Sequence, residues 1–278
     1  MPDINEIRDN LPGVTDTVYL NTGTCGPLPQ HVYDLMEAEM RTDLTKARID
    51  SDHFPKIMRS RTKVREVVAA AVGADPSEIA VTSSTTDGMM QTIVGYRWQP
   101  GDELLISNIE HPGGLVPSFL AKRRNNLRMR VVDLGLGGGD PADIVAAFER
   151  AITPRTRMIV LSHVSYTTGA KLPVKEITAM AHAHDVLVVV DAAQSYGALD
   201  LDLHDLGVDA YAGSGQKWMC GPDGTGMLYV KASRVGEFEQ AFVSGGILRE
   251  SMDYLGGSVS PSAGAARFDS AGRNVALL

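Results

Sequence analysis

The sequence predicts an α/β fold in which a mostly parallel central sheet carries helices on both of its faces. Short runs of β-branched and apolar residues alternate with helical patterns along the chain, which is typical of βαβ units. Two of these runs, residues 158–161 and 186–190, are apolar at every position, as expected for strands buried on both faces of a parallel sheet. A length of 278 residues suits one α/β domain, or a large domain with part of a second.

The first predicted elements are two helices and a short strand. Residues 29–49 and 56–72 have the apolar periodicity of amphipathic helices. The apolar face of the first helix comprises Val32, Leu35, Met36 and Met40. The expected buried stripe of the second helix comprises Ile57, Val64, Val67, Val68 and Ala71. The Asp75-Pro76 pair ends the helical pattern, and residues 79–81 predict the first strand.

Strands and helices then alternate up to about residue 245. Further strands are predicted at residues 104–106, 130–132, 158–161, 186–190, 208–211 and 227–230. Helices are predicted from Asp140 to about Ala151 and near residues 173–184. Asp140 is a favourable N-cap, and Pro141 suits the first helical position. Beyond Gly245 the sequence is loop-like and predicts no periodic element.

Composition excludes several classes of function. With 26 basic and 34 acidic residues the net charge is −8, which argues against a nucleic-acid partner or an anionic membrane surface. No uncharged apolar stretch reaches the ~18 residues of a spanning helix, and the N-terminus lacks the pattern of a signal peptide. Cys25 and Cys220 cannot build a disulfide framework or a zinc site alone, so we expect no metal and a reducing, cytoplasmic setting.

Nucleotide-binding signatures are absent from the sequence. It contains neither Gly-x-x-x-x-Gly-Lys-Ser/Thr nor Gly-x-Gly-x-x-Gly. Residues 135–139 come nearest to the second pattern, but Asp140 stands at the last glycine position. A flexible surface loop explains this segment better than a phosphate site.

Polar side chains follow four predicted strands, at the edge of a parallel sheet where ligands bind. Hydroxyl-rich residues 83–88, residues 110–114 with His111, Asp191 with Gln194, and residues 213–218 with Lys217 all stand at such ends. Alone, Asp191 reads equally well as a strand-end cap, and Lys217 reads as a surface residue. Together with the hydroxyls and the imidazole they predict a Schiff-base site for pyridoxal phosphate (PLP).

The chemical groups of PLP explain why these residue types belong together. Its aldehyde needs an amine, and its pyridine nitrogen needs a carboxylate to hold the proton that makes the ring an electron sink. Its phosphate needs hydroxyls, backbone N–H groups and a helix N-terminus. Helix capping is the alternative explanation for Thr85 and Thr86, and the two readings are compatible because both use the same geometry.

The chain resembles the class V aminotransferase family of fold-type I PLP enzymes, within the branch of cysteine/cystine C–S lyases, ergothioneine-type lyases and isopenicillin-epimerase-like proteins. The resemblance covers roughly residues 17–270. Its motifs are Tyr19-Leu20-Asn21-Thr22-Gly23, Thr85-Thr86-Asp87-Gly88, Glu110-His111-Pro112, Ser162-His163-Val164 with Thr168-Gly169, Asp191-Ala192-Ala193-Gln194, and Ser214-Gly215-Gln216-Lys217-Trp218. The separation of Asp191 from Lys217 is that of the family.

This resemblance implies a role for each matching residue. Lys217 would form the Schiff base, Asp191 would pair with the pyridinium nitrogen, and His111 would stack on the ring. Gln194 would donate to the phenolic oxygen of the ring. The phosphate would be held by Thr85, Thr86 and Ser214, with Gln216 beside them. Asn21 and Thr168 are weaker candidates for contacts with the substrate.

The chain departs from the family pattern at three places. Gln216 replaces the histidine that usually precedes the lysine, which predicts weaker phosphate binding because glutamine carries no charge. The segment Arg267-Phe268-Asp269 resembles the family's Arg-Phe-Glu, but its threonine is replaced near Gly272. The family also continues well beyond the last residue of this sequence and there carries the arginine for the substrate carboxylate.

From the resemblance we expect the chain to divide into three segments and to turn over its substrate slowly. They are an N-terminal segment (1–16), a PLP-binding large domain (17–245) and the start of a small C-terminal domain (246–278). Without the distant arginine, only Arg249, Arg267 and Arg273 remain near the end of the sequence, so we expect poor turnover.

The expected function is a PLP-dependent C–S lyase that eliminates sulfur from cysteine, cystine or a cysteine conjugate. Epimerase, aminotransferase and cysteine desulfurase remain alternatives, as does a PLP-binding protein with little turnover. Desulfuration needs a mobile cysteine, for which Cys25 is a candidate, although a small packed residue is its simpler explanation. The resemblance also implies a homodimer, with the apolar face of helix 29–49 and the Arg267 region as candidate contacts.

Overall fold

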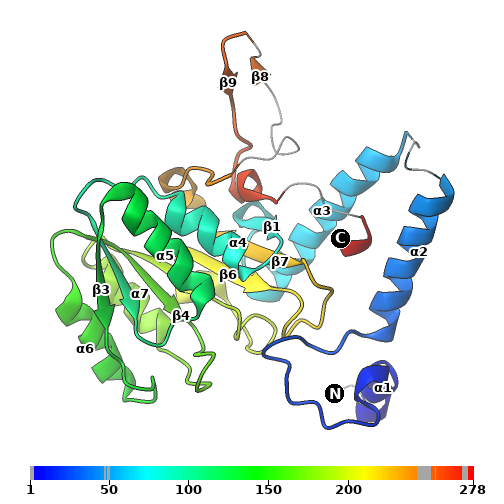
Figure 1. The fold of residues 1–278 in the computed structure, drawn as a ribbon, viewed down its shortest axis with the longest axis horizontal. Coiled ribbons are helices and arrows are strands. Elements are labelled where there is room, and N and C mark those ends of the chain that lie inside the picture. Colours follow the sequence, from blue (N-terminus) through cyan, green and yellow to red (C-terminus); the bar gives the residue numbers. More distant parts are fainter. Residues whose placement is uncertain (1–2, 47, 49–50, 243–251, 254, 271–274) are drawn as a thin grey trace.

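The computed structural model describes residues 3–278 apart from 47, 49–50, 243–251, 254 and 271–274. Its centre is a seven-stranded sheet in the order β1-β7-β6-β5-β4-β2-β3 (Figure 1). The strands are β1 (Ile79–Thr82), β2 (Glu103–Ser107), β3 (Arg128–Val132), β4 (Thr156–Ser162), β5 (Leu187–Asp191), β6 (Ala210–Ser214) and β7 (Gly226–Val230). Strands β2 to β6 run parallel, and β7 runs antiparallel to β1 and β6. The predicted α/β class and mostly parallel sheet are therefore confirmed.

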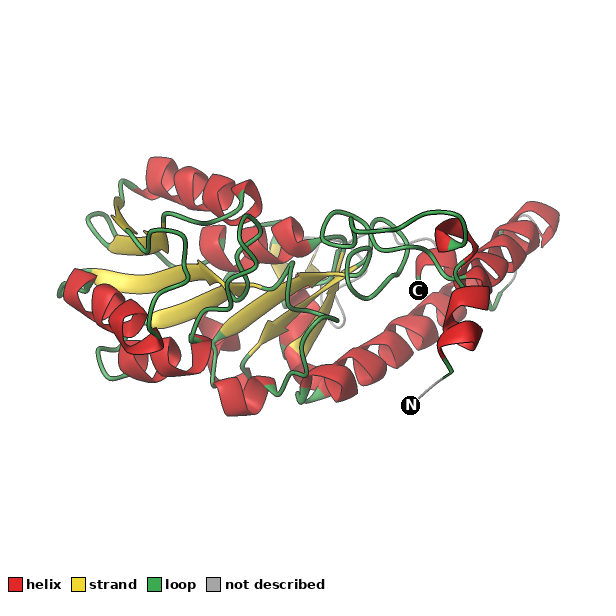
Figure 2. Cartoon of the chain, turned by 90° about the horizontal axis from the view of Figure 1, so that it is seen from below, coloured by secondary structure: helices red, strands yellow, loops and turns green. Residues whose placement is uncertain are grey.

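Helices cover both faces of this sheet (Figure 2). The α-helices of the described residues are α1 (Ile4–Asp9), α2 (Gln30–Lys46), α3 (His53–Val72), α4 (Thr85–Met89), α5 (Pro112–Asn125), α6 (Pro141–Ala151), α7 (Val174–His182) and α8 (Leu203–Leu206). A π-helical turn over Met90–Val94 continues α4. No helix in the described residues is long and apolar enough to cross a membrane.

Two apolar cores lie on opposite faces of the sheet, because neighbouring strand residues point to opposite sides. Leu105 and Ile159 belong to the core that includes Phe148 of α6. Leu104 and Val160 belong to the other core, with the residues of α4 and α5. This burial on both faces explains the uniformly apolar strands that predicted a parallel sheet.

Helix α5 was not predicted from the sequence. Its buried residues are Gly113, Gly114, Pro117, Ser118 and Ala121, so it lacks a stripe of large apolar side chains. Small residues let this helix approach the sheet closely, and the same property hides the apolar period on which sequence prediction depends.

The predicted buried stripe of α3 is wrong at two positions. Val67 is 56% exposed and Ala71 is also exposed, whereas Arg61, Ala69 and Val72 are buried. Helix α2 and the first part of α3 extend beyond the edge of the sheet (Figure 1), and α2 has no buried residue. The end of α3 therefore buries the face that carries Ala69 and Val72, and α2 has no core against its apolar face.

The segment after residue 245 contains more structure than the sequence indicates. A short hairpin joins β8 (Met252–Asp253) to β9 (Ser258–Val259) and projects from the body of the protein (Figure 1). A 3-10 turn over Ala265–Phe268 then packs into the core, where both terminal residues are fully buried. Asp269 accepts bidentate hydrogen bonds of 2.7 and 2.8 Å from Arg65 of α3. This segment therefore completes the core beside β1.

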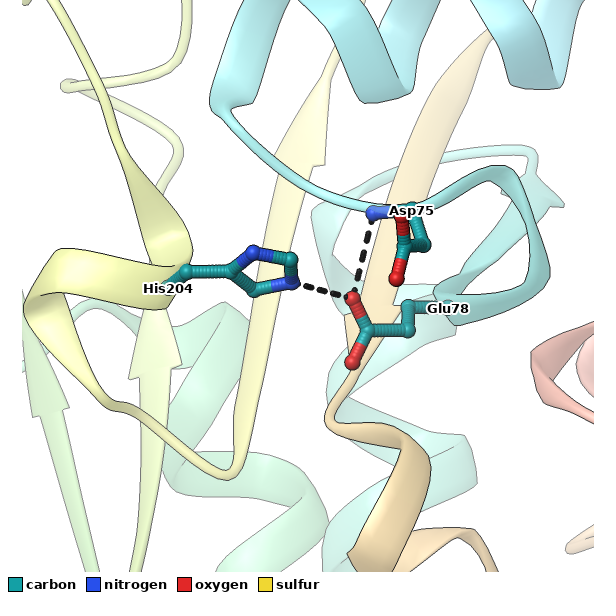
Figure 3. A group of neighbouring side chains, drawn as sticks. All are labelled: Asp75, Glu78 and His204. Carbon is teal, nitrogen blue, oxygen red and sulfur yellow. Dashed lines mark hydrogen bonds and ion pairs between the residues drawn. The ribbon is translucent and has the colours of Figure 1, made fainter.

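Asp75, Glu78 and His204 join the turn before β1 to α8 (Figure 3). The buried carboxylate of Glu78 accepts hydrogen bonds from the Asp75 N–H (3.1 Å), His204 Nε2 (2.6 Å) and the Ala232 N–H (2.8 Å). The three side chains offer donor atoms within 4.8 Å of one another, but both oxygens of Glu78 already have protein partners. A structural clamp therefore explains the group without a metal ion.

We expect His204→Ala to destabilise the protein mainly between pH 4.5 and 6.5. Burial alone raises the pKa of Glu78, but its hydrogen bonds to His204, Ala232 and Asp75 hold that pKa below 4.5. The bond to Glu78 raises the pKa of His204 above 6.5. Glu78 loses its contribution to the free energy of unfolding as pH falls through its lowered pKa. His204 loses its contribution as pH rises through its raised pKa.

Because the imidazole is half exposed, the expected loss is no more than about 1 kcal/mol. Urea unfolding of the wild type and the variant at pH 5.5 and pH 9 measures it. An equal loss at both pH values would contradict an ionic contribution from His204.

Candidate functional site

A cavity of about 580 Å³ opens at the carboxyl ends of the parallel strands. Among the residues that line it are Asn21, His111, Tyr166, Gln194, Lys217 and Trp218. A second cavity, of about 600 Å³, is lined by residues of α3, α7 and α8 and by His163, and none of the predicted site residues lines it. The first cavity is therefore the candidate site.

Asp191 is the last residue of β5 and is 3% exposed. Its Oδ1 accepts a 2.9 Å hydrogen bond from the Ala193 N–H, whereas the buried Oδ2 has no partner among the described residues. Burial raises the pKa of Asp191, and the Ala193 N–H, Lys217 and His111 offset this only in part. A buried carboxylate oxygen without a partner fits a cationic group on a ligand, which would favour the ionised form.

Lys217 follows β6 and lies within electrostatic reach of Asp191. Its half-buried position lowers the pKa of the amine, while the nearby Asp191 and Cys25 oppose that shift. The amine consequently loses its proton more readily than a surface lysine does. A neutral amine is the form that attacks an aldehyde.

Buried hydroxyls meet where α4 begins. Both the backbone N–H and the hydroxyl of Thr85 contact the Ser214 hydroxyl, at 2.9 and 2.7 Å. Thr85 is 5% exposed and Ser214 is 4% exposed, but Thr86 is exposed. The structure thus joins the end of β6 to the first turn of α4, the arrangement expected of a phosphate cradle.

Gly113 marks the point at which three predicted residues converge. A Cβ atom built there would lie 2.9 Å from the Thr86 hydroxyl, 3.1 Å from Nδ1 of His111 and 3.9 Å from Oδ2 of Asp191. A side chain at this position would fill the space between these groups. The structure therefore brings Thr86, His111 and Asp191 together although they lie on three different elements.

His111 is the N-cap of α5 and lines the cavity. Its Nδ1 accepts a 3.0 Å hydrogen bond from the Gly113 N–H, which fixes the plane of the ring. Tyr166 packs edge-on against this ring, with centroids 4.8 Å apart and an interplanar angle of 84°. Because the two rings meet at a steep angle, His111 can still stack on the flat ring of a ligand.

Gln194 joins the N-terminal segment to the lysine loop. Its Nε2 donates to the Gly23 carbonyl at 2.9 Å, and its Oε1 accepts from Nε1 of Trp218 at 2.8 Å. No sequence pattern predicted the contact with Trp218, because the two residues are far apart along the chain. The hydrogen bond between Gln194 and Trp218 forms because the turn after β5 faces the loop after β6 in the folded chain.

The remaining predicted residues differ in their surroundings. Asn21 lines the cavity, whereas the Thr168 hydroxyl donates to the Leu136 carbonyl at 3.0 Å and is not among the lining residues. Gln216 is half-buried, and its Oε1 has no partner in the described part of the chain. Arg267 donates to the Ser262 carbonyl at 3.1 Å, and both Arg249 and Arg273 lie outside the described residues.

Glu110 is a buried carboxyl group beside the site; it belongs to the Glu110-His111-Pro112 motif, but the sequence indicated no role for it. It is 5% exposed and accepts hydrogen bonds from the hydroxyls of Ser107 and, at 2.6 Å, Ser162. Burial raises the pKa of Glu110 to about 7; the two serine hydroxyls lower it, and Asp191 raises it further. Glu110 thus connects the ends of β2 and β4 and directly precedes His111 in the chain.

These residues fit the groups of PLP. The unpartnered Oδ2 of Asp191 suits a pyridinium nitrogen, and the deprotonation-prone amine of Lys217 suits an aldehyde. The cavity that His111 lines would admit a flat ring, and the hydroxyls of Thr85 and Ser214 would suit a phosphate. Each group of the cofactor therefore has a chemically matched side chain.

Comparisons with known proteins agree with this reading. The family model described as aminotransferase class-V matches residues 18–264. Isopenicillin N epimerase of Streptomyces clavuligerus is 33% identical over 246 residues, which cover 87% of this chain and 60% of the relative. A probable cysteine desulfurase of Methanothermobacter thermautotrophicus is 33% identical over 245 residues, again covering 87% of this chain and 60% of the relative.

A solved structure of the cystine C–S lyase C-DES in complex with its product, cysteine persulfide, is also similar. It superposes with a TM-score of 0.89 at 29% identity and covers 96% of this chain and 70% of that chain. The chain spans about 60% of the length of the curated relatives that it matches.

Proposed function

The chain belongs to the aminotransferase class-V family of PLP-dependent enzymes, and on that premise we propose that it is a C–S lyase. Its substrate would be an amino acid with sulfur on the β-carbon, such as cysteine, cystine or a cysteine conjugate. The observation that carries the proposal is a buried Asp191 oxygen without a partner in the described residues, within electrostatic reach of the Lys217 amine, which lines the cavity and has a lowered pKa. The similarity to a cystine C–S lyase supports the choice of reaction.

Bound PLP supplies an electron sink for the charge that develops on the α-carbon of an amino acid. Asp191 would hold the proton on the ring nitrogen. The lowered pKa of Lys217 suits its Nζ to accept the α-proton of the substrate, and the sulfur group then leaves from the β-carbon. Thr85 and Ser214 would anchor the phosphate, and His111 would hold the ring in place.

The same first proton transfer also serves epimerisation, transamination and desulfuration, so the products must distinguish these reactions. Elimination from cystine yields pyruvate, ammonia and a persulfide, whereas desulfuration of cysteine yields alanine. Cys25 is exposed and acts electrostatically on Lys217, which makes it the thiol to test for desulfuration.

The test is a product analysis of the purified, PLP-saturated chain with cysteine, cystine and a cysteine sulfoxide conjugate. We expect pyruvate and ammonia in equal amounts, no product from Lys217→Ala, and unchanged pyruvate formation by Cys25→Ser. Alanine without pyruvate, lost in Cys25→Ser, would contradict elimination in favour of desulfuration. Substrate of inverted configuration as the sole product would favour epimerisation, and no product at all would contradict each of these activities.

We propose a second copy of the chain as its partner. Helix α2 exposes large apolar side chains, including Leu35 (66%), Met40 (58%) and Leu44 (82%). Covering such a surface by self-association would remove it from water. Light scattering at micromolar concentration should give twice the chain mass, and Leu44→Glu should lower it; a monomeric wild type would contradict this proposal.

We also propose that the chain works in a reducing compartment, the cytoplasm. Cys25 and Cys220 are both free thiols in the structure, and Cys25 is exposed. A reducing environment keeps exposed thiols in this form.

A further inference from the structure

The side-chain amide of Gln194 has a defined orientation. An amide offers one oxygen as acceptor and two N–H groups as donors. The indole N–H of Trp218 can only donate, so it selects Oε1 of Gln194, which it reaches at 2.8 Å. The Gly23 carbonyl can only accept, so it selects Nε2, at 2.9 Å. Both neighbours therefore require the same orientation.

This orientation leaves one N–H of Gln194 for a ligand. Gln194 lines the cavity, and its oxygen and its other N–H already have partners. If the amide were reversed, its oxygen would face an anionic ligand atom and repel it. Trp218 and the Gly23 carbonyl both oppose that reversal, and Trp218 is the side-chain partner that holds the oxygen.

The backbone around Trp218 holds the indole in place. A Cβ atom at Gly197, which has a φ of +89°, would lie 2.7 Å from the carbonyl carbon of Trp218. The Gly26 N–H donates to the Gln216 carbonyl at 2.7 Å, and the Cys220 N–H donates to the Lys217 carbonyl at 3.0 Å. The loop that presents the Lys217 amine therefore also presents the Trp218 N–H.

We propose that Trp218 is a positioning residue, whose indole N–H turns the Gln194 amide so that it offers a donor to the anionic ring oxygen of PLP. The inference rests on the proposed cofactor role of Gln194. Trp218 itself acts through Gln194 and has no part in proton transfer.

Trp218→Phe tests this directly, because it keeps an aromatic ring and removes the N–H. The dissociation constant of PLP should rise about three- to tenfold, as expected for the loss of one hydrogen bond to an anionic acceptor. The pH midpoint of the visible absorption of bound PLP should also move upward, since the deprotonated ring oxygen loses a donor. Met219→Leu alters an exposed neighbour in the same loop and should change neither value.

A double-mutant cycle separates positioning from a purely structural role. In the Gln194→Ala background, Trp218→Phe should cause no further weakening of PLP binding. An equal weakening in both backgrounds would overturn the proposal, because Trp218 would then act without Gln194. An unchanged dissociation constant for Trp218→Phe alone would overturn it as well.

The cofactor-free chain gives an independent readout that does not depend on the proposed function. The sequence has two tryptophans, and the buried Trp98 donates its indole N–H to the Ile93 carbonyl at 2.7 Å. Gln194→Ala should shift the indole ¹⁵N–¹H resonance of Trp218 and leave that of Trp98 unchanged. A Trp218 resonance that does not respond would show that the bond is absent, even if PLP binds normally.

Discussion

Replacing Asp191 with alanine should weaken the binding of PLP about a hundred- to a few thousandfold. Asp191 is 3% exposed, and its Oδ2 has no partner among the described residues. Removing one member of a buried ion pair costs on the order of 3–5 kcal/mol, because the other charge stays buried without compensation. The pyridinium of PLP would be that remaining charge, so its proton would be lost and the ring would release more readily.

The pKa of Asp191 explains why the effect should appear only with the cofactor. In the chain alone, burial raises the pKa of this carboxyl. A cation at Oδ2 reverses the direction, since an opposite charge favours the ionised form. Asp191→Ala should therefore leave the cofactor-free protein at least as stable as the wild type.

Equilibrium binding of PLP and exchange of the substrate α-proton in D₂O measure the two consequences. Asp191→Asn is the matched control, because it keeps the shape and the bond from the Ala193 N–H but cannot carry a charge. It should bind PLP better than Asp191→Ala and still lose proton exchange. Exchange near the wild-type rate in either variant would contradict the role of Asp191.

Glu110→Gln should stabilise the protein relative to the wild type as pH rises. Burial raises the pKa of Glu110 from 4.5 to about 7, with Ser107 and Ser162 as its hydrogen-bond donors. Between these values the folded chain holds a proton that the unfolded chain has released, so the wild type loses stability as pH increases. The difference amounts to about 3 kcal/mol above pH 8, at 1.36 kcal/mol per pKa unit.

Unfolding by urea at pH 5 and pH 8.5 compares the two proteins. Glutamine resembles the protonated carboxyl in shape and can keep contacts with both serines, so Glu110→Gln should flatten the pH dependence by about 3 kcal/mol. Glu149→Gln, which changes an exposed glutamate on α6, should leave the pH dependence as it is. A Glu110→Gln profile parallel to that of the wild type would show that Glu110 is ionised throughout.

The sequence predicted the parts of the fold that depend on large apolar side chains. The runs at 158–161 and 186–190 became β4 and β5, because strands buried on both faces need such residues. Helix α5 remained hidden because its buried face consists of small residues. The stripe of α3 was misjudged at Val67, because the helix buries a neighbouring face that carries Ala69 and Val72.

The candidate site also has some features that the sequence can predict and others that depend on the folded structure. Asp191 and Lys217 could be named as candidates because their chemistry and their place at strand ends can be read along the chain. The partners of Gln194 could not be predicted, because the bond from Trp218 depends on how two loops face each other. The Glu110-His111-Pro112 motif did not reveal the raised pKa of Glu110, since that shift arises from burial in the folded chain.

Covalent attachment of PLP to Lys217 is the most direct test of the central claim. The purified chain should be loaded with PLP, reduced with borohydride, digested and mapped by mass spectrometry, with Lys217→Ala treated in parallel. We expect the PLP mass on the peptide that contains Lys217, and no reducible adduct in the variant. An adduct on a different lysine, or one that persists in Lys217→Ala, would contradict the account.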